Sequence, residues 1–225
     1  MIQFEVPRHL SRWADNSLKS GQNVMATSNQ GTILLFQEAG MEFVVKTAMG
    51  RGAVRHARQA TLEREHEAYR RMEGLPGVPR CFGMVDGRYL VLERIHGIPY
   101  RDADIADRET WFAALLQTLQ GFHARGVSHG DLKSKDNLMF TDTGQPCVID
   151  FGTTVLLKDG FHPINNRMFE YARQLDLNAW VKHKYEGDYE AASPADSALL
   201  NYSFVEKWLR KRRQKRDLRN ERKTS

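Results

Sequence analysis

The stretch VSHGDLKSKDNLMFTDTGQPCVIDFG, from Val127 to Gly152, decides the fold of this chain. It reads as a polar turn, a short apolar strand, a tight turn at residues 142–144 and a second apolar strand that ends at Asp150. Asp131 and Asp150 therefore lie at opposite ends of one predicted hairpin. Loops at strand ends commonly carry binding and catalytic residues. The hairpin thus predicts a polar site, for which the rest of the chain has to supply further side chains.

The sequence before this hairpin predicts a small β-sheet that contains a lysine. Residues 23–48, NVMATSNQGTILLFQEAGMEFVVKTA, hold three apolar runs separated by turn signals at residues 29–31 and 39–40. This pattern predicts a three-stranded antiparallel meander. Lys46 follows two valines in the third run, where a positive charge is costly to bury without an anionic partner.

A helix with several acidic residues is predicted next. Residues 50–77, GRGAVRHARQATLEREHEAYRRMEGLPG, are typical of a helix that ends at Gly74 and Pro76. Three glutamates on this helix are candidates to pair with Lys46: Glu63, Glu65 and Glu67.

The remaining sequence predicts one more strand and then mainly helices. Residues 88–97, RYLVLERIHG, are typical of a strand that ends at a glycine. Helical spacing of apolar residues recurs in three later segments, at residues 110–126, 168–185 and 197–213. This order predicts an α+β chain with two lobes joined near residues 93–97. We expect a domain at 1–206, with a small lobe at about 20–93 and a large lobe at about 97–206, and a basic tail at 207–225.

Length and composition are typical of a globular protein. With 225 residues, of which 41% are apolar, the chain is long enough for one large or two small packed domains. No run of about 18 apolar residues occurs, and the first residues, MIQFEVPRHLSRW, lack the apolar core of a signal peptide. We therefore expect a cytoplasmic protein. Cys81 and Cys147 are too few for a disulfide framework or a zinc site.

Positive charge is concentrated at the C-terminal end of the chain. Residues 207–225 hold ten Lys and Arg residues against Asp217 and Glu221, a net charge of +8. Since the whole chain carries +5, the remainder carries −3. Such a tail is either a solvated helix or a segment that contacts phosphate groups or anionic lipid.

Three motifs resemble those of the protein-kinase-like superfamily and occur in its order. FVVK at 43–46 resembles the family's V-A-I-K strand, HGDLKSKDNLM at 129–139 resembles its H-R-D-L-x-x-x-N loop, and VIDFG at 148–152 supplies D-F-G. The resemblance runs from about Asn23 to Trp180. It implies a two-lobed α+β fold with a small antiparallel β N-lobe carrying one helix and a mainly helical C-lobe. It also implies ATP and Mg²⁺ as cofactors.

The resemblance assigns the residues that bind the phosphates of ATP. Lys46 would hold the α- and β-phosphates. Glu65 is the preferred partner of Lys46, because the apolar Tyr69 and Met72 follow it at i+4 and i+7 on the helix, as in the family. The two neighbouring glutamates remain rivals for this role.

Further contacts with ATP are implied outside the helix. Backbone groups at Glu93 and Ile95, in YLVLERIHG, would face the purine. No G-x-G-x-x-G motif covers the phosphates. Only Gly31, in TSNQGTIL, allows a turn with backbone N–H groups near the nucleotide. The cover over the phosphates is therefore expected to differ from that of the family.

The remaining assignments concern phosphoryl transfer itself. Asp131 would orient or deprotonate the acceptor hydroxyl, Lys133 would steady the transferred group, and Asp150 would bind Mg²⁺. In the family a metal-binding Asn lies five residues after the catalytic Asp, whereas here that position is Asp136 and Asn137 is the sixth. Asn137 is the preferred ligand because a strand follows it directly, and Asp136 is the alternative.

The acceptor is suggested by the segment after the D-F-G motif. No A-P-E motif follows, and only about two dozen residues reach RQLDLNAW, which argues against a regulated protein kinase. HGDLK and RQLDLN look like the lipopolysaccharide core kinases, which phosphorylate heptose or 3-deoxy-manno-octulosonic acid, and also like RIO-type and Bud32-type atypical kinases. The first resemblance implies a sugar hydroxyl as acceptor at the inner face of the cytoplasmic membrane, with the tail on anionic lipid. The second implies a Ser/Thr protein acceptor and a tail that contacts nucleic acid. A third interpretation is a pseudokinase that binds a partner without catalysis.

Overall fold

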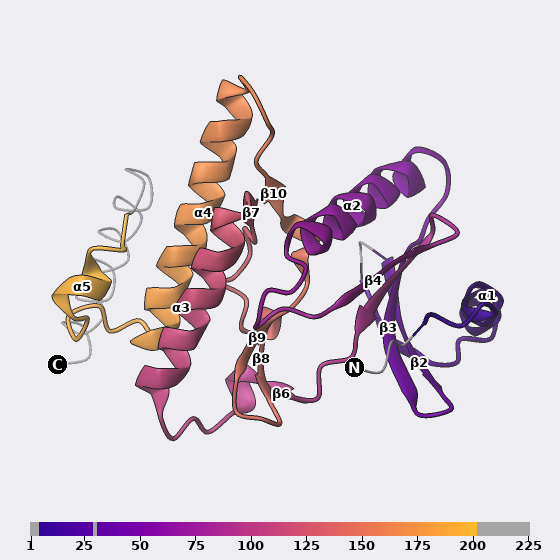
Figure 1. The fold of residues 1–225 in the computed structure, drawn as a ribbon, viewed down its shortest axis with the longest axis horizontal. Coiled ribbons are helices and arrows are strands. Elements are labelled where there is room, and N and C mark those ends of the chain that lie inside the picture. Colours follow the sequence, from indigo (N-terminus) through magenta and orange to yellow (C-terminus); the bar gives the residue numbers. More distant parts are fainter. Residues whose placement is uncertain (1–4, 29–30, 202–225) are drawn as a thin grey trace, which may run out of the picture.

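A five-stranded antiparallel sheet builds the smaller part of the molecule, at the right of Figure 1. The computed structural model describes residues 5–28 and 31–201. The strands are β1 (Val24–Thr27), β2 (Gly31–Glu38), β3 (Met41–Ala48), β4 (Cys81–Val85) and β5 (Tyr89–Glu93), in the order β1-β2-β3-β5-β4. Strands β1 to β3 form the expected meander.

The alternation of side chains along β3 decides which way Lys46 points. Phe43 and Val45 are buried on one face of the sheet, so Val44 and Lys46 lie on the opposite face. Lys46 is paired with Ile33 on β2 and with Leu90 on β5, which places it in the interior of the sheet. The lysine is therefore held rigidly on both sides.

Helix α1 (Leu10–Ser20) covers the face of the sheet that Lys46 does not use. Its Leu10 and Ala14 are fully buried and belong to the same apolar cluster as Phe36 and Phe43. The sequence predicted a small lobe that starts near residue 20 and contains one helix, and this prediction was incomplete. The lobe has two helices, and the first begins at Leu10.

Helix α2 (Gly52–Arg71) lies against the other face and reaches the large lobe (Figure 1). Helix α2 ends at Arg71, a few residues before the predicted end at Gly74. Gly74 itself has a left-handed backbone at φ 74°. Buried residues of α2, such as Ala68 and Tyr69, share one apolar core with residues of the large lobe, such as Phe122 and Phe151. The core therefore runs through both lobes.

The large lobe is mainly helical, and the hairpin predicted within residues 127–152 lies near the junction of the lobes (Figure 1). The long helices are α3 (Arg108–Ala124) and α4 (Pro163–Lys184), with short 3₁₀ turns at Tyr100–Asp102, Lys135–Asn137 and Phe151–Thr153. Strands β8 (Leu138–Thr141) and β9 (Pro146–Val148) form the predicted hairpin, and β6 (Gly97–Pro99) extends it. Strands β7 (Val127–Ser128) and β10 (Val155–Leu156) form a separate pair.

The last described residues return to α4. A short helix, α5 (Pro194–Ser197), ends where the sequence predicted a helix to begin, and the rest of the predicted helix over 197–213 lies mainly outside the described residues. Asn178 on α4 donates from its amide to the Asn201 carbonyl at 3.0 Å. The basic tail at 207–225 also lies outside the described residues. Within the described ranges, no helix has the length and apolarity needed to cross a bilayer.

Candidate active site

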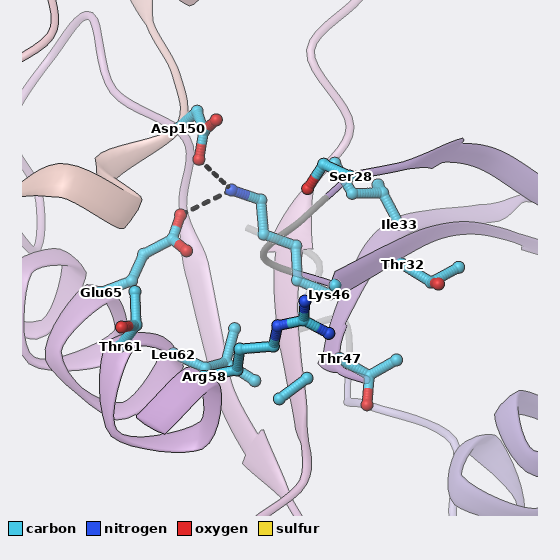
Figure 2. A pocket seen from close by; sticks show the side chains of 12 residues that line it. Ser28, Thr32, Ile33, Lys46, Thr47, Arg58, Thr61, Leu62, Glu65 and Asp150 are labelled. Atoms are coloured by element: carbon cyan, nitrogen blue, oxygen red, sulfur yellow. Dashed lines mark hydrogen bonds and ion pairs between the residues drawn. The ribbon is translucent and has the colours of Figure 1, made fainter. Parts of the chain in front are cut away.

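Lys46 contacts two carboxylates, one from each lobe (Figure 2). Its Nζ lies 2.6 Å from Glu65 Oε1 on α2 and 2.7 Å from Asp150 Oδ1, which follows β9. The Glu65 side chain is only 4% exposed, whereas that of Asp150 is 45% exposed. Glu65 is thus a buried anchor, and Asp150 is accessible to a ligand.

The two rival glutamates do not reach Lys46. Glu67 pairs with Arg70 and Arg71 on α2 at 2.6 and 2.9 Å, and Glu63 accepts a 3.3 Å hydrogen bond from Gln59. The structure therefore brings the preferred glutamate to the lysine.

The charges of this triad are set by burial and by each other. Burial disfavours charge on Lys46, but Glu65 and Asp150 more than offset it and raise the pKa of the lysine. Burial alone would raise the pKa of Asp150, but the Lys46 ammonium holds it below the ordinary value. Burial raises the pKa of Glu65, while Lys46 opposes this effect. A cation and an accessible carboxylate therefore persist side by side at neutral pH.

A pocket between β2, β3 and α2 opens onto the triad (Figure 2). Gly31 borders this pocket but has a different structural role from the one expected. It is the first residue of β2, and a Cβ built on it would lie 2.1 Å from the Thr47 carbonyl oxygen. Glycine is required here by close strand packing rather than by a turn. Glu93 ends β5 and Ile95 lies in the connection after it, and neither borders the pocket.

The catalytic loop predicted from the sequence precedes β8. Asn137 donates from its amide nitrogen to the Asp131 carbonyl oxygen at 3.0 Å, so the amide oxygen of Asn137 remains available to a ligand. Asp136 instead pairs with Arg101 at 2.6 Å. Lys133 is 78% exposed, and its Nζ lies 4.0 Å from Asp131 Oδ1. The loop thus presents a carboxylate and an exposed ammonium side by side.

A buried aspartate that the sequence did not single out holds this loop in place. Asp176 on α4 is fully buried and accepts hydrogen bonds from the backbone N–H groups of His129 and Gly130 at 2.8 and 2.9 Å. Its carboxylate also lies 3.0 Å from His123 Nε2. His129 is itself a packing residue, because its ring contacts the Ile149 carbonyl and the backbone N–H of Asp131. The hint in the sequence was the stretch RQLDLN, which contains Asp176 and resembles kinase sequences, but no role was assigned to the aspartate.

The residues after Asp150 pack into the core between the lobes. Asp150 has a left-handed backbone at φ 64°, which is uncommon for a residue other than glycine. The fully buried ring of Phe151 contacts the rings of Tyr69 on α2, Phe122 on α3 and His129. The strained backbone therefore turns the Asp150 carboxylate toward Lys46 while Phe151 points inward.

Two arginines of α2 hold the segment that follows. Arg64 donates to the Gly152 carbonyl at 3.3 Å, and Arg71 donates to the Leu157 carbonyl at 2.8 Å. We call this pair of contacts the arginine clamp. Because Glu65 lies between these arginines on α2, the clamp fixes the helix that carries the partner of Lys46. This clamp could not be predicted from residue types, since its acceptors are backbone carbonyls.

The oxygen donors of the site suit Mg²⁺. The ion prefers carboxylate and amide oxygens and usually keeps several waters. Asp150 offers an accessible carboxylate, and Asn137 offers an amide oxygen. Across the described residues, no three His, Cys, Asp or Glu side chains gather as a metal cluster.

Two known proteins are similar in sequence to part of this chain. The serine/threonine-protein kinase ppk34 of Schizosaccharomyces pombe is 37% identical over 67 residues, which are 29% of this chain and 19% of that protein. The serine/threonine-protein kinase pim-2 of Danio rerio is 35% identical over 72 residues, which are 32% of this chain and 22% of that protein. The chain has a protein-kinase-like fold.

The kinase-like similarity covers only part of each protein. The match spans about a fifth of the length of each of these two relatives. No model of a protein family matches the chain. Neither relative is named for lipopolysaccharide or for the atypical kinases. The narrower resemblance therefore stays a proposal.

Proposed function

We propose that the protein is a phosphotransferase that moves the γ-phosphoryl group of ATP to an alcohol. The observation that carries this proposal is the buried contact of Lys46 with Glu65, beside the accessible carboxylate of Asp150. Phosphoryl transfer depends mainly on positioning and on neutralising charge. This cleft offers a fixed cation for the phosphates and oxygen donors for Mg²⁺, which would neutralise phosphate charge when bound.

The residues of the chain would divide the reaction between them. Lys46 would hold the α- and β-phosphates, and Asp150 and Asn137 would hold the metal ion. The acceptor hydroxyl, oriented by Asp131, would attack the γ-phosphorus as the bond to the β–γ bridging oxygen breaks. The hydroxyl proton would pass to Asp131, and ADP would leave. Lys133 is exposed enough to follow the transferred group.

We favour a sugar hydroxyl of the lipopolysaccharide core as the acceptor. The support is the short segment at 153–162 between Gly152 and α4, part of which is paired as β10 with β7. Such a segment offers little extended backbone for a peptide substrate to dock on. A location at the inner face of the cytoplasmic membrane follows from this acceptor.

A Ser/Thr protein acceptor is the second candidate. The observation that favours it is that both matched relatives are serine/threonine-protein kinases. A pseudokinase that binds a partner without catalysis is the third candidate. The presence of Lys46, Asp131 and Asp150, the residues assigned to phosphate binding, proton transfer and metal binding, argues against it.

One experiment separates these candidates. The full chain is incubated with Mg²⁺ and ATP labelled on the γ-phosphate, with deacylated lipopolysaccharide core or with a generic protein mixture. Asp131→Asn serves as the inactive control. Label in the core fraction supports the sugar acceptor, and label in Ser or Thr supports the protein acceptor. ATP binding without ADP release in any mixture would leave the pseudokinase as the function.

A further inference from the structure

The N-terminal end of α4 carries an apolar patch that nothing in the described chain covers. Four large side chains make up this α4 patch, in the loop before the helix and on its first turns: Phe161, Ile164, Met168 and Tyr171. The three helical members are spaced i, i+4 and i+7, so they share one face. Phe161 is 90% exposed and Ile164 is 76% exposed. Of the nine large exposed apolar side chains among the described residues, these four lie within eleven positions.

Positive charge surrounds the patch. A hollow of about 740 Å³ lies between α2, β10 and the start of α4. The ionisable residues along it are Arg64, Arg71, Lys158 and His162 against one acid, Glu67, which is paired with Arg71 and with Arg70. Arg64 and Arg71 belong to the arginine clamp, so Lys158 is the cation of the hollow that the clamp does not engage. On α4 itself, Arg167 adds a charge, while Glu170 is paired with Arg173 at 2.6 Å. Asp159, in the loop, is the remaining acid of this stretch.

We propose that the α4 patch docks the protein on an anionic phospholipid surface. The apolar side chains would enter the boundary between headgroups and acyl chains, and Lys158 and Arg167 beside them would contact lipid phosphates. Figure 1 shows that this end of α4 and the loop before it project from the large lobe, at the top of the view. A projecting apolar tip with a cationic surround is the shape that interfacial insertion requires.

A second copy of the chain fits this face less well. A two-fold interface would bring the same patch together with itself, and the arginines and lysine of both copies would then face each other. An anionic bilayer instead complements their charge. The inference gives a physical site to the membrane location proposed above. Vesicle binding needs neither ATP nor acceptor, so its failure would leave the proposed phosphotransferase reaction untouched.

The test uses the full chain and vesicles of phosphatidylcholine with or without phosphatidylglycerol. Phe161→Ser combined with Ile164→Gln should weaken binding to the anionic vesicles by at least about tenfold. The matched control is Val54→Gln, which removes an exposed apolar side chain from α2 and should bind like the wild type. Unchanged melting curves and unchanged ATP turnover would show that both variants are folded.

Insertion is measured separately, so that attachment through the basic tail cannot imitate it. Phe161→Trp should be quenched by brominated acyl chains beyond the wild-type level, whereas Val54→Trp should not. Equal vesicle binding by the double variant and the wild type would overturn the proposal. So would an unquenched Trp at position 161, or a double variant that loses a wild-type dimer in sedimentation.

Discussion

At the scale of single residues, the side chain of Asp131 is the one expected to receive a proton. Asp131→Asn keeps the size and most of the hydrogen-bonding shape but removes the negative charge. We expect kcat to fall by at least about 10²-fold, while the affinity for ATP holds. Steady-state kinetics together with a direct nucleotide-binding measurement check this. A variant with the wild-type rate would exclude Asp131 from the chemistry.

The metal ligand can be separated from its neighbour in the same way. Asn137 is tied to the Asp131 carbonyl, whereas Asp136 is turned toward Arg101. Asn137→Ala should therefore raise the Mg²⁺ concentration needed for half-maximal activity by about tenfold or more, and Asp136→Ala should change it little. Titrating Mg²⁺ at saturating ATP provides the measurement. The reverse order would assign the metal to Asp136.

The sequence predicted those site residues that act through local pattern. Glu65 was preferred because Tyr69 and Met72 follow it at helical spacing, and both are buried as that preference requires. Asp176 could not be predicted, because its partners are backbone N–H groups that lie 46 and 47 residues away in the chain. Sequence spacing carries no information about such contacts.

At the scale of elements, the position of α2 depends on the arginine clamp, and two adjacent arginines allow a matched test. Arg71 pairs with Glu67 and also donates to the Leu157 carbonyl, whereas Arg70 pairs only with Glu67 among the contacts described for its side chain. Arg71→Gln should loosen α2 against the large lobe, displace Glu65 and lower kcat/KM by about tenfold, as loss of a charged hydrogen bond would. Arg70→Gln should stay near the wild-type value.

Hydrogen exchange supplies the readout that distinguishes positioning from general damage. Faster exchange in Arg71→Gln should be confined to residues 153–158 and α2. An equal effect of the two variants on activity would contradict the clamp.

The pair formed by Glu67 with its arginines also predicts a pH dependence. Arg70, and then Arg71, lower the pKa of Glu67 to about 2 from an ordinary value of 4.5. A lowered pKa stabilises the fold above pH 4.5, and this contribution is lost as the pH falls toward 2. Because Glu67 and both arginines are partly exposed, solvent screens the pair, and we expect only about 0.5 kcal/mol, or a shift in Tm of about 1–2 °C.

The measurement compares melting of the wild type and Glu67→Gln from pH 7 downward. The difference in Tm should be steady to about pH 5 and then shrink. Glu63→Gln on the same helix, whose acceptor role is limited to Gln59, is the control. A difference in Tm between the wild type and Glu67→Gln that grows as the pH falls would contradict this predicted pH dependence.

Elements were predictable where turn residues separate clear apolar runs, and a short helix without a capping side chain was missed. The β2–β3 meander and the β8–β9 hairpin matched because their apolar runs are separated by turn residues. Helix α1, LSRWADNSLKS, was missed although its apolar residues follow helical spacing, because it has only 11 residues and no side-chain cap at its start. It forms because Leu10 and Ala14 pack on the sheet, which is a tertiary effect.

At the scale of the whole molecule, the prediction concerns the basic tail. Deleting residues 211–225 removes eight cations and two acids, a net loss of six charges. Each Lys or Arg near an anionic bilayer contributes about 1 kcal/mol, within a Debye length. Binding to anionic vesicles should therefore fall steeply and lose most of its salt dependence, while turnover of a soluble acceptor persists.

Co-sedimentation with vesicles at several salt concentrations checks this, with structured RNA as the parallel ligand. Undiminished vesicle binding after truncation would rule out a membrane role for the tail. Loss of RNA binding alone would favour the atypical protein kinase.

The ten residues between Gly152 and α4 have a consequence for how the activity of this protein would be regulated in a cell. Part of the segment is locked into a strand pair, and α2 is fastened to its main chain. If the protein is the phosphotransferase proposed above, its site is assembled as soon as it folds, so its output should follow its copy number. Control would then rest on synthesis, degradation and the supply of acceptor, and doubling the gene dose should nearly double the product.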